Sequence, residues 1–129
     1  MAKDILDTVL ELTDETYAEV VVRSDAVIFI DFYSDYCGPC RVVLKYLESL
    51  AEHFKDEKVI IAKMNVDDNP TTADKLNVTH IPYIVVIGED KTIKRARTGV
   101  LSLNGYIKMI DKTLHRESLL SKIFDKIKS

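Results

Sequence analysis

The stretch Tyr36-Cys37-Gly38-Pro39-Cys40 decides the fold, and it contains both cysteines of the 129-residue chain, three positions apart. Such a Cys-x-x-Cys pair can be a reversible dithiol, half of a metal site, or a chance occurrence. Gly38 and Pro39 allow a tight turn between the cysteines, and proline suits the first turn of a helix. The spacing therefore favours a redox pair with Cys37 at the N-terminus of a helix.

A metal site is the weaker interpretation of the same pair. Zinc needs about four ligands. The chain has no second cysteine pair, and its three histidines, His53, His80 and His115, are scattered singly. His80 could supply a third ligand, but no fourth candidate stands out, so we expect no metal.

Length and charge restrict the class of protein further. We expect one domain, residues 1–129, large enough to fold without a stabilising disulfide. A net charge of −3 and the absence of a basic cluster argue against nucleic acid as the main partner. No apolar run approaches the roughly 18 residues of a membrane span or forms a signal peptide. We therefore expect a cytoplasmic protein, in which a close cysteine pair is more often catalytic or metal-bound than a static crosslink.

The run Ala26 to Tyr33 precedes the cysteines and consists almost entirely of β-branched and aromatic residues. Such a run predicts a strand that is buried on both faces. Its single charge, Asp31, either reaches water near the end of the strand or is buried. We favour burial, because Phe32 and Tyr33 extend the run beyond it. Burial would raise the pKa of Asp31 toward the range in which a carboxylate exchanges protons near neutral pH.

The remaining pattern alternates strands and helices. The expected strands are 9–12, 59–66, 83–87 and 92–98, and the expected helices are 14–22, 39–54, 70–76 and one that begins after Ser102. Lys63 is the one internal charge of the strand at 59–66, and it is either solvated or the partner of Asp31. The short turn between the last two strands predicts an antiparallel hairpin.

The last helix changes its apolar face near His115 to Glu117. It therefore either breaks there or continues with a second apolar stripe. We favour a tail that packs on the core over one that contacts a second copy or a partner.

Several motifs in combination resemble the thioredoxin family over about residues 9–114. They are Asp31-Phe32-Tyr33-Ser34-Asp35-Tyr36-Cys37-Gly38-Pro39-Cys40-Arg41, Lys63 within Ala62 to Asp67, Ile81-Pro82, and Thr98-Gly99-Val100. The resemblance implies an α/β fold, the thioredoxin fold, with a central mixed β-sheet of about five strands, helices on both faces and an extra C-terminal helical extension at 115–129. It also implies a buried Asp31 near Lys63 and a cis peptide before Pro82 facing the cysteines.

The resemblance further implies a protein-disulfide reductase, a thiol-disulfide oxidoreductase whose only redox group is the Cys37–Cys40 pair. Cys37 would attack, Cys40 would resolve, and Asp31, restrained by Lys63, would accept a proton. The substrate surface would comprise Tyr36, Gly38, Pro39, Ile81, Pro82, Thr98, Gly99 and Val100. The expected partners are a thioredoxin reductase-type electron donor and protein disulfides, and the chain is expected to be monomeric. The alternative function is a docking module whose tail, residues 117–129, binds a specific partner.

Two departures from the family pattern bear on the site. The family usually has tryptophan at the positions of Tyr33 and Tyr36, whereas this chain contains no tryptophan. His80 stands beside Ile81-Pro82, where the family often has a small residue. A protonated His80 would favour the Cys37 thiolate, but a side chain turned to solvent would not, and the sequence is compatible with both.

Overall fold

The computed structural model describes residues 8–128, and in the C-terminal helix it describes side chains up to residue 114 and at 123, 126 and 127. One five-stranded sheet has the order β1-β3-β2-β4-β5. Its strands are β1 Leu10–Glu11, β2 Val27–Tyr33, β3 Val59–Asn65, β4 Tyr83–Ile87 and β5 Ile93–Thr98. The helices are α2 Tyr17–Arg23, α3 Gly38–His53, α4 Pro70–Lys75 and α5 Leu103–Lys128. At the N-terminus the sequence allows either a short helix or an irregular lead over residues 1–8, and residues 1–7 of this segment lie outside the described residues.

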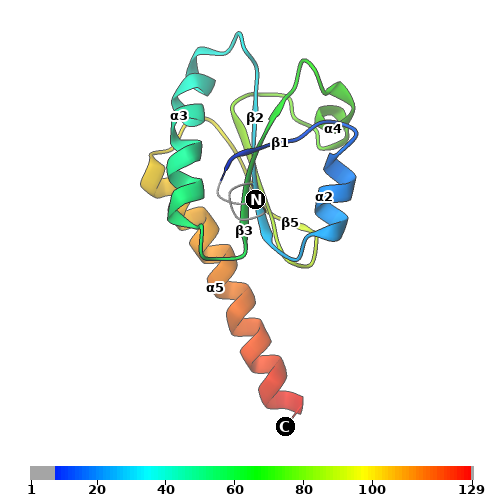
Figure 1. Cartoon of the computed structure of the whole chain (residues 1–129), viewed down its shortest axis with the longest axis vertical. Helices are drawn as coiled ribbons and strands as arrows, with labels where there is room; N and C mark the ends of the chain where they lie inside the picture. Colours follow the sequence, from blue (N-terminus) through cyan, green and yellow to red (C-terminus); the bar gives the residue numbers. More distant parts are fainter. Residues whose placement is uncertain (1–7, 129) are drawn as a thin grey trace.

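The sheet is mixed, as predicted. Strands β1, β3 and β2 are parallel, β4 runs antiparallel to β2, and β5 runs antiparallel to β4. Helices α3 and α5 cover one face and α2 and α4 the other (Figure 1). Every residue of β2 is buried, which explains its continuous apolar sequence, because this central strand has a layer of helices on both sides.

Two apolar layers fill the space between the sheet and the helices. The layer under α3 and α5 takes Val27 and Phe29 from β2, and the layer on the other face takes Ile28 and Ile30. Successive side chains of a strand point to opposite faces. Asp31 therefore lies on the same face of the sheet as Phe29, the face that α3 and α5 cover.

Helix α2 begins at Tyr17, three residues later than the sequence pattern predicted. The residues before it form a turn in which Thr16 N–H donates to the carbonyl of Thr13. The Asp14 carboxylate, which was expected to lie in the first turn of this helix, instead accepts from the backbone N–H groups of Thr71 and Thr72, at 3.2 and 2.8 Å. Asp14 thus caps α4, and a contact so distant in sequence gave no local signal.

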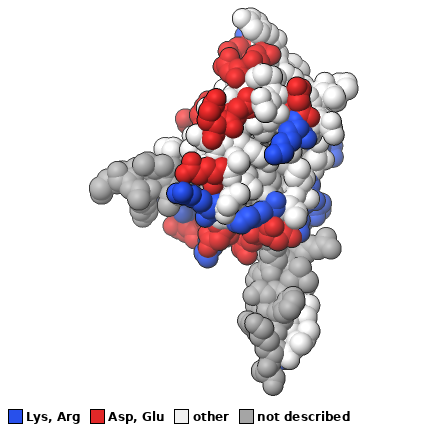
Figure 2. Space-filling view, turned by 90° about the vertical axis from the view of Figure 1, so that its right-hand side faces the viewer, with Lys and Arg blue, Asp and Glu red and all other residues white. Residues whose placement is uncertain are grey.

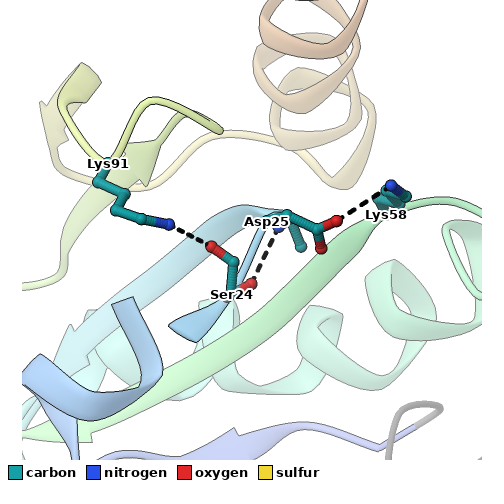
Figure 3. A network of polar contacts seen from close by, with 5 residues as sticks. Ser24, Asp25, Lys58 and Lys91 are labelled. Atoms are coloured by element: carbon teal, nitrogen blue, oxygen red, sulfur yellow. Dashed lines mark hydrogen bonds and ion pairs between the residues drawn. The ribbon is translucent and has the colours of Figure 1, made fainter. Parts of the chain in front are cut away.

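Polar contacts connect the loops at the end of the sheet where β2 begins (Figure 3). Lys91 Nζ donates to the Ser24 carbonyl at 2.6 Å, and Lys58 pairs with Asp25 at 3.1 Å. The Ser24 hydroxyl accepts from the N–H of Ala26 at 2.9 Å. These contacts hold the turns before β2, β3 and β5 together, and the loop that carries the cysteines follows β2, at its other end.

Helix α5 continues without a break to Lys128 and extends well beyond the body of the protein (Figure 1). Ile123 is 48% exposed and Ile127 is 75% exposed. The tail therefore does not break near His115, and the favoured interpretation that it packs on the core is wrong for these two side chains. A helix directed away from the sheet cannot bury them against the core of the same chain.

Candidate active site

Cys37 and Cys40 form a disulfide at the start of α3, with their Cα atoms 5.3 Å apart. Cys37 is the N-cap residue of the helix, and its Sγ accepts the backbone N–H of Cys40 at 3.2 Å. Cys37 is half-buried, whereas Cys40 is fully buried. A helix N-terminus stabilises negative charge, because its N–H groups are unpaired and its dipole is positive there. The partly exposed cysteine thus has its sulfur at a position that favours a thiolate.

Hydrogen bonds hold the turn between β2 and α3 and so fix the position of Cys37. Ser34 Oγ donates to the Asp67 carboxylate at 2.5 Å and accepts from the N–H of Tyr36 at 3.3 Å. The N–H of Cys37 donates to the Ser34 carbonyl at 3.3 Å. Tyr36, Gly38 and Pro39 remain exposed around the disulfide, and Tyr36 reaches 93% exposure. Tyr36 is therefore available to a bound substrate.

Asp31 has no accessible surface, which confirms the predicted burial. Neither of its carboxylate oxygens has a hydrogen-bond partner among the described residues. Burial raises the pKa of Asp31 to about 7, although the positive charge of Lys63 opposes this rise. A carboxylate with such a pKa can accept and return a proton at neutral pH.

Lys63 is the neighbour of Asp31 on β3 in the register of the sheet, yet it makes its ion pair elsewhere. Its Nζ lies 3.6 Å from Oε1 of Glu11, which faces it from β1, and 5.7 Å from the centroid of the Tyr33 ring. The Tyr33 hydroxyl donates to both Glu11 oxygens, at 3.2 and 3.1 Å. The predicted proximity of Lys63 to Asp31 is confirmed, but within the described residues no ion pair joins them.

The Ile81–Pro82 peptide bond is cis, as the family resemblance implied. Strand β4 starts just after it, beside the end of β2, because Phe32 pairs with Tyr83 in the antiparallel register. This register brings the Ile81 carbonyl to 3.9 Å from Cys37 Sγ. Pro82 is buried and Ile81 half-buried, so the backbone at this point borders the disulfide.

The segment Thr98 to Val100 joins the same surface. The N–H of Gly99 donates to the Pro82 carbonyl at 2.9 Å. Gly99 has a φ of +92°, a conformation that side-chain-bearing residues rarely adopt, which accounts for glycine here. Thr98 and Val100 are exposed. Gly99 is therefore joined to Pro82, and the carbonyl of the preceding residue, Ile81, borders Cys37.

Tyr106 supports this segment, and the sequence pattern gave no reason to single it out. It is fully buried, its ring meets Phe29 edge to face at 5.7 Å between centroids, and its hydroxyl accepts from the N–H of Leu101 at 2.9 Å. The same hydroxyl donates to the Gly99 carbonyl at 3.4 Å. An aromatic residue in a helix pattern predicts packing, and only the fold shows its hydroxyl reaching the loop before the helix.

His80 is exposed and contacts its neighbour in the chain. Its Nδ1 lies 3.0 Å from the hydroxyl of the adjacent Thr79, and both residues are exposed. Among the residues that the structure describes, no hydrogen bond joins His80 to either sulfur. The His80 side chain is therefore turned toward solvent.

The surroundings of the site are acidic on one side. Acidic side chains gather over the upper part of the face in Figure 2, the end of the molecule where α3 begins. A hollow of about 540 Å³ beside Tyr33 is lined by Glu11, Glu15, Asp35 and Asp68 among others. Within residues 8–128, no group of three or more His, Cys, Asp or Glu side chains is arranged to hold a metal ion. No helix there is long and apolar enough to cross a membrane.

A partly exposed cysteine at a helix N-terminus, disulfide-bonded to a buried one three residues on, defines a thiol-disulfide exchange site. Comparison with known proteins agrees. The model of the Thioredoxin family matches residues 8–112. Thioredoxin 2 of Chlorobaculum tepidum is 35% identical over 102 residues, covering 79% of this chain and 92% of that protein. The thioredoxin of Haemophilus influenzae is 39% identical over 88 residues, which are 68% and 81% of the two chains.

Solved structures show the same likeness. Chloroplastic thioredoxin z superposes with a TM-score of 0.76 at 25% identity, covering 84% of this chain and 96% of its own. A thioredoxin variant of Halobacterium salinarum gives 0.74 at 28% identity, covering 84% and 92%. The chain belongs to the thioredoxin family. With its Cys37–Cys40 disulfide, it is a thiol-disulfide oxidoreductase that reduces protein disulfides.

Proposed function

We propose that Cys37 is the attacking cysteine and Cys40 the resolving one. In the reduced protein the Cys37 thiolate attacks one sulfur of a substrate disulfide, forms a mixed disulfide and releases the other substrate sulfur as a thiolate. Cys40 then loses its proton and attacks Cys37 Sγ. This step frees the second substrate sulfur and leaves Cys37–Cys40 oxidised, so two electrons have passed to the substrate. The observation that carries the assignment is the half-exposed position of Cys37 at the helix N-terminus above a fully buried Cys40. Mapping of the mixed disulfide trapped by a Cys40→Ser variant tests it.

Asp31 accepts the proton of Cys40 in this proposal. Its carboxylate lies on the face of β2 that α3 covers, it has no described hydrogen-bond partner, and its pKa is raised to about 7 by burial. A buried thiol cannot release its proton to bulk water directly, so a buried carboxylate with such a pKa, on the sheet face that α3 covers, is suited to take it. Lys63 and Glu11 act through Asp31, since they set the charge in its surroundings.

Opposite shifts are expected when the two partners of this ion pair are replaced. Glu11→Gln removes a negative charge and releases Lys63, which lowers the pKa of Asp31 by about one unit. Lys63→Met removes the positive charge and raises it. The midpoint of the pH dependence of the resolving step, measured by stopped-flow release of a fluorescent thiol, should move down for the first variant and up for the second.

Tyr33→Phe is the matched control for this pair. It removes the hydrogen bonds from the Tyr33 hydroxyl to Glu11 but keeps the charges of Glu11 and Lys63. Its midpoint should stay close to that of the wild type. Midpoints that move in the same direction for Glu11→Gln and Lys63→Met would remove both residues from the proposed role.

The substrate lies in an extended conformation along Ile81, Pro82 and the segment Thr98 to Val100, with Tyr36, Gly38 and Pro39 on its other side. The position of the Ile81 carbonyl beside Cys37 and the exposure of Thr98 and Val100 support this, because extended peptides bind by strand-like backbone contacts. The acidic residues near Tyr33 would favour substrates with basic residues beside the disulfide.

Tyr106→Phe tests the role of the Thr98 to Val100 segment. Loss of the hydroxyl leaves the Leu101 N–H without its acceptor, and should cost about 1–3 kcal/mol of unfolding free energy in urea. The freed segment should also raise the KM for insulin more than it lowers kcat. Tyr46→Phe is the matched control, because the Tyr46 hydroxyl makes no hydrogen bond among the described residues. Equal effects of the two variants on KM would contradict the proposal that the Tyr106 hydroxyl supports this segment.

The partners and setting follow from this chemistry. A thioredoxin reductase-type donor would return the Cys37–Cys40 disulfide to the dithiol, with no cofactor in this chain. We place the protein in the cytoplasm, a reducing compartment suited to a reductant, and we propose that it acts as a monomer of one domain, with a core of about residues 9–114 and a helical tail at 115–129. The alternative docking function has support from the exposed Ile123 and Ile127, while the complete redox site supports the reductase.

A further inference from the structure

A second hollow, of about 340 Å³, lies between the edge strand β5 and the helix α5. Its lining includes Arg95 and Arg97 from the strand and Lys108 and Lys112 from the helix. Four basic side chains thus surround one concave surface in a protein whose net charge is −3. The four cations do not form a cluster in the sequence, because β5 and α5 contribute two each and the two pairs lie apart in the chain.

The fold explains why these side chains meet. Arg97 pairs with Ile84 and Arg95 with Val86, so both arginines lie on the sheet face that α3 and α5 cover. Lys108 and Lys112 are four residues apart and therefore share one side of α5. Both lysines are exposed, and Arg95 is half-buried. The hollow is partly open to solvent.

These four cations have no acidic partner in the part of the chain that the structure describes. Other cations of the protein do have one: Lys94, on the same strand, lies 2.7 Å from Asp90, and Lys58 lies 3.1 Å from Asp25. Like charges placed together oppose folding. An arrangement that gathers four of them, with no acidic partner among the described side chains, is therefore suited to an anion from outside the chain.

We propose that this hollow binds a compact anion with two or three linked phosphate groups. The planar guanidinium groups of Arg95 and Arg97 match phosphate oxygens in pairs, and the ammonium groups of Lys108 and Lys112 act as point charges. Four positive charges balance the three to four negative charges typical of a diphosphate or triphosphate at neutral pH. A volume of about 340 Å³ lies in the range of small-molecule sites. The site is separate from the disulfide and extends the function beyond reduction of protein disulfides.

Calorimetric titration with sodium tripolyphosphate at low salt tests the proposal. The wild type should bind one equivalent, and the double variant Arg97→Gln/Lys108→Gln should bind at least about tenfold more weakly, since charge-assisted hydrogen bonds are lost. The matched control is Lys94→Gln, which removes a positive charge from the same strand outside the hollow. Its affinity should stay within about twofold of the wild type, because an exposed charge at a distance is screened. All three proteins should reduce insulin at the same rate, which shows that the fold and the redox site are intact.

Two results would overturn the proposal. The first is absence of saturable binding, or a loss of affinity in Lys94→Gln that is about half, on a logarithmic scale, of the loss in the double variant. Because the control removes one charge and the double variant removes two, that outcome would reduce the effect to net charge. The second comes from an arm with phosphatidylcholine vesicles that contain a phosphorylated inositol lipid. Binding to these vesicles without binding of free tripolyphosphate would assign the cations to a lipid surface. The proposal is supported if the wild type alone binds tripolyphosphate saturably and still does so at 150 mM salt.

Discussion

A Cys37→Ser variant is expected to lose insulin reduction by on the order of a thousandfold or more, because serine cannot replace a thiolate in attack on a disulfide. Cys40→Ser should also fail to turn over, but for a different reason. It keeps the attacking sulfur at the N-terminus of α3 and lacks only the group that resolves the mixed disulfide. The measurement is insulin precipitation in the presence of dithiothreitol, with wild-type protein as the reference.

The two variants separate the roles in single-turnover experiments. With a model disulfide that releases a chromophoric thiol, Cys40→Ser should release one equivalent and stop, while Cys37→Ser should release none. Retention of insulin reduction by Cys37→Ser, together with loss of all covalent trapping by Cys40→Ser, would show that the assignment is reversed.

Replacement of Asp31 should have the largest effect on stability, with a sign set by pH. The ordinary pKa of the carboxyl, 3.8, describes the unfolded chain, and in the folded protein burial raises it to about 7. Between these values the unfolded state ionises first, so the free energy of unfolding falls as the pH rises. A rise of about three pKa units corresponds to a loss of about 4 kcal/mol in the free energy of unfolding. This loss is absent below pH 3.8 and complete above pH 7.

An Asp31→Asn variant lacks this titration. It should be more stable than the wild type at pH 8, by up to about 4 kcal/mol less the cost of burying an amide, and it should lose that advantage toward pH 4. Urea unfolding of both proteins at pH 4, 6 and 8 gives the difference. An unchanged difference across this range would mean that Asp31 is not buried as an acid with a raised pKa.

The same variant should turn over more slowly, mainly at the resolving step. General-base catalysis typically contributes on the order of a hundredfold or more, and asparagine cannot accept the proton of Cys40. The rate of the resolving step should also lose its rise around pH 7. Kinetics that match the wild type from pH 6 to 9 would remove Asp31 from the mechanism even if the stability result holds.

The elements of the fold could be predicted because their signals are local. The apolar run of β2 required burial on both faces, and Pro39 and the apolar stripe after it marked α3. The burial of Asp31 followed from its place within the run. The cis peptide before Pro82 could not have come from periodicity, because such bonds are a minority; it came from the family resemblance and is confirmed.

Contacts that depend on register were not predictable in the same way. Glu11 faces Lys63 only because β1 pairs with β3, and the two residues lie far apart in the chain. The hydroxyl of Tyr106 and the capping carboxylate of Asp14 likewise act on backbone that only the tertiary fold brings near. The packing of the tail could not be predicted for a related reason. An apolar stripe indicates that a face of the helix can be buried, but it does not indicate what buries it.

The most direct test of the central claim is the site of the covalent intermediate. Cys40→Ser protein is reduced, mixed with oxidised insulin at neutral pH, quenched with acid and digested without reduction, and the peptides are sequenced by mass spectrometry. We expect insulin chains to be joined to the peptide that contains Cys37 and to be released by dithiothreitol. If this variant forms no adduct, while a Cys37→Ser protein forms one through Cys40, then Cys37 is not the attacking cysteine.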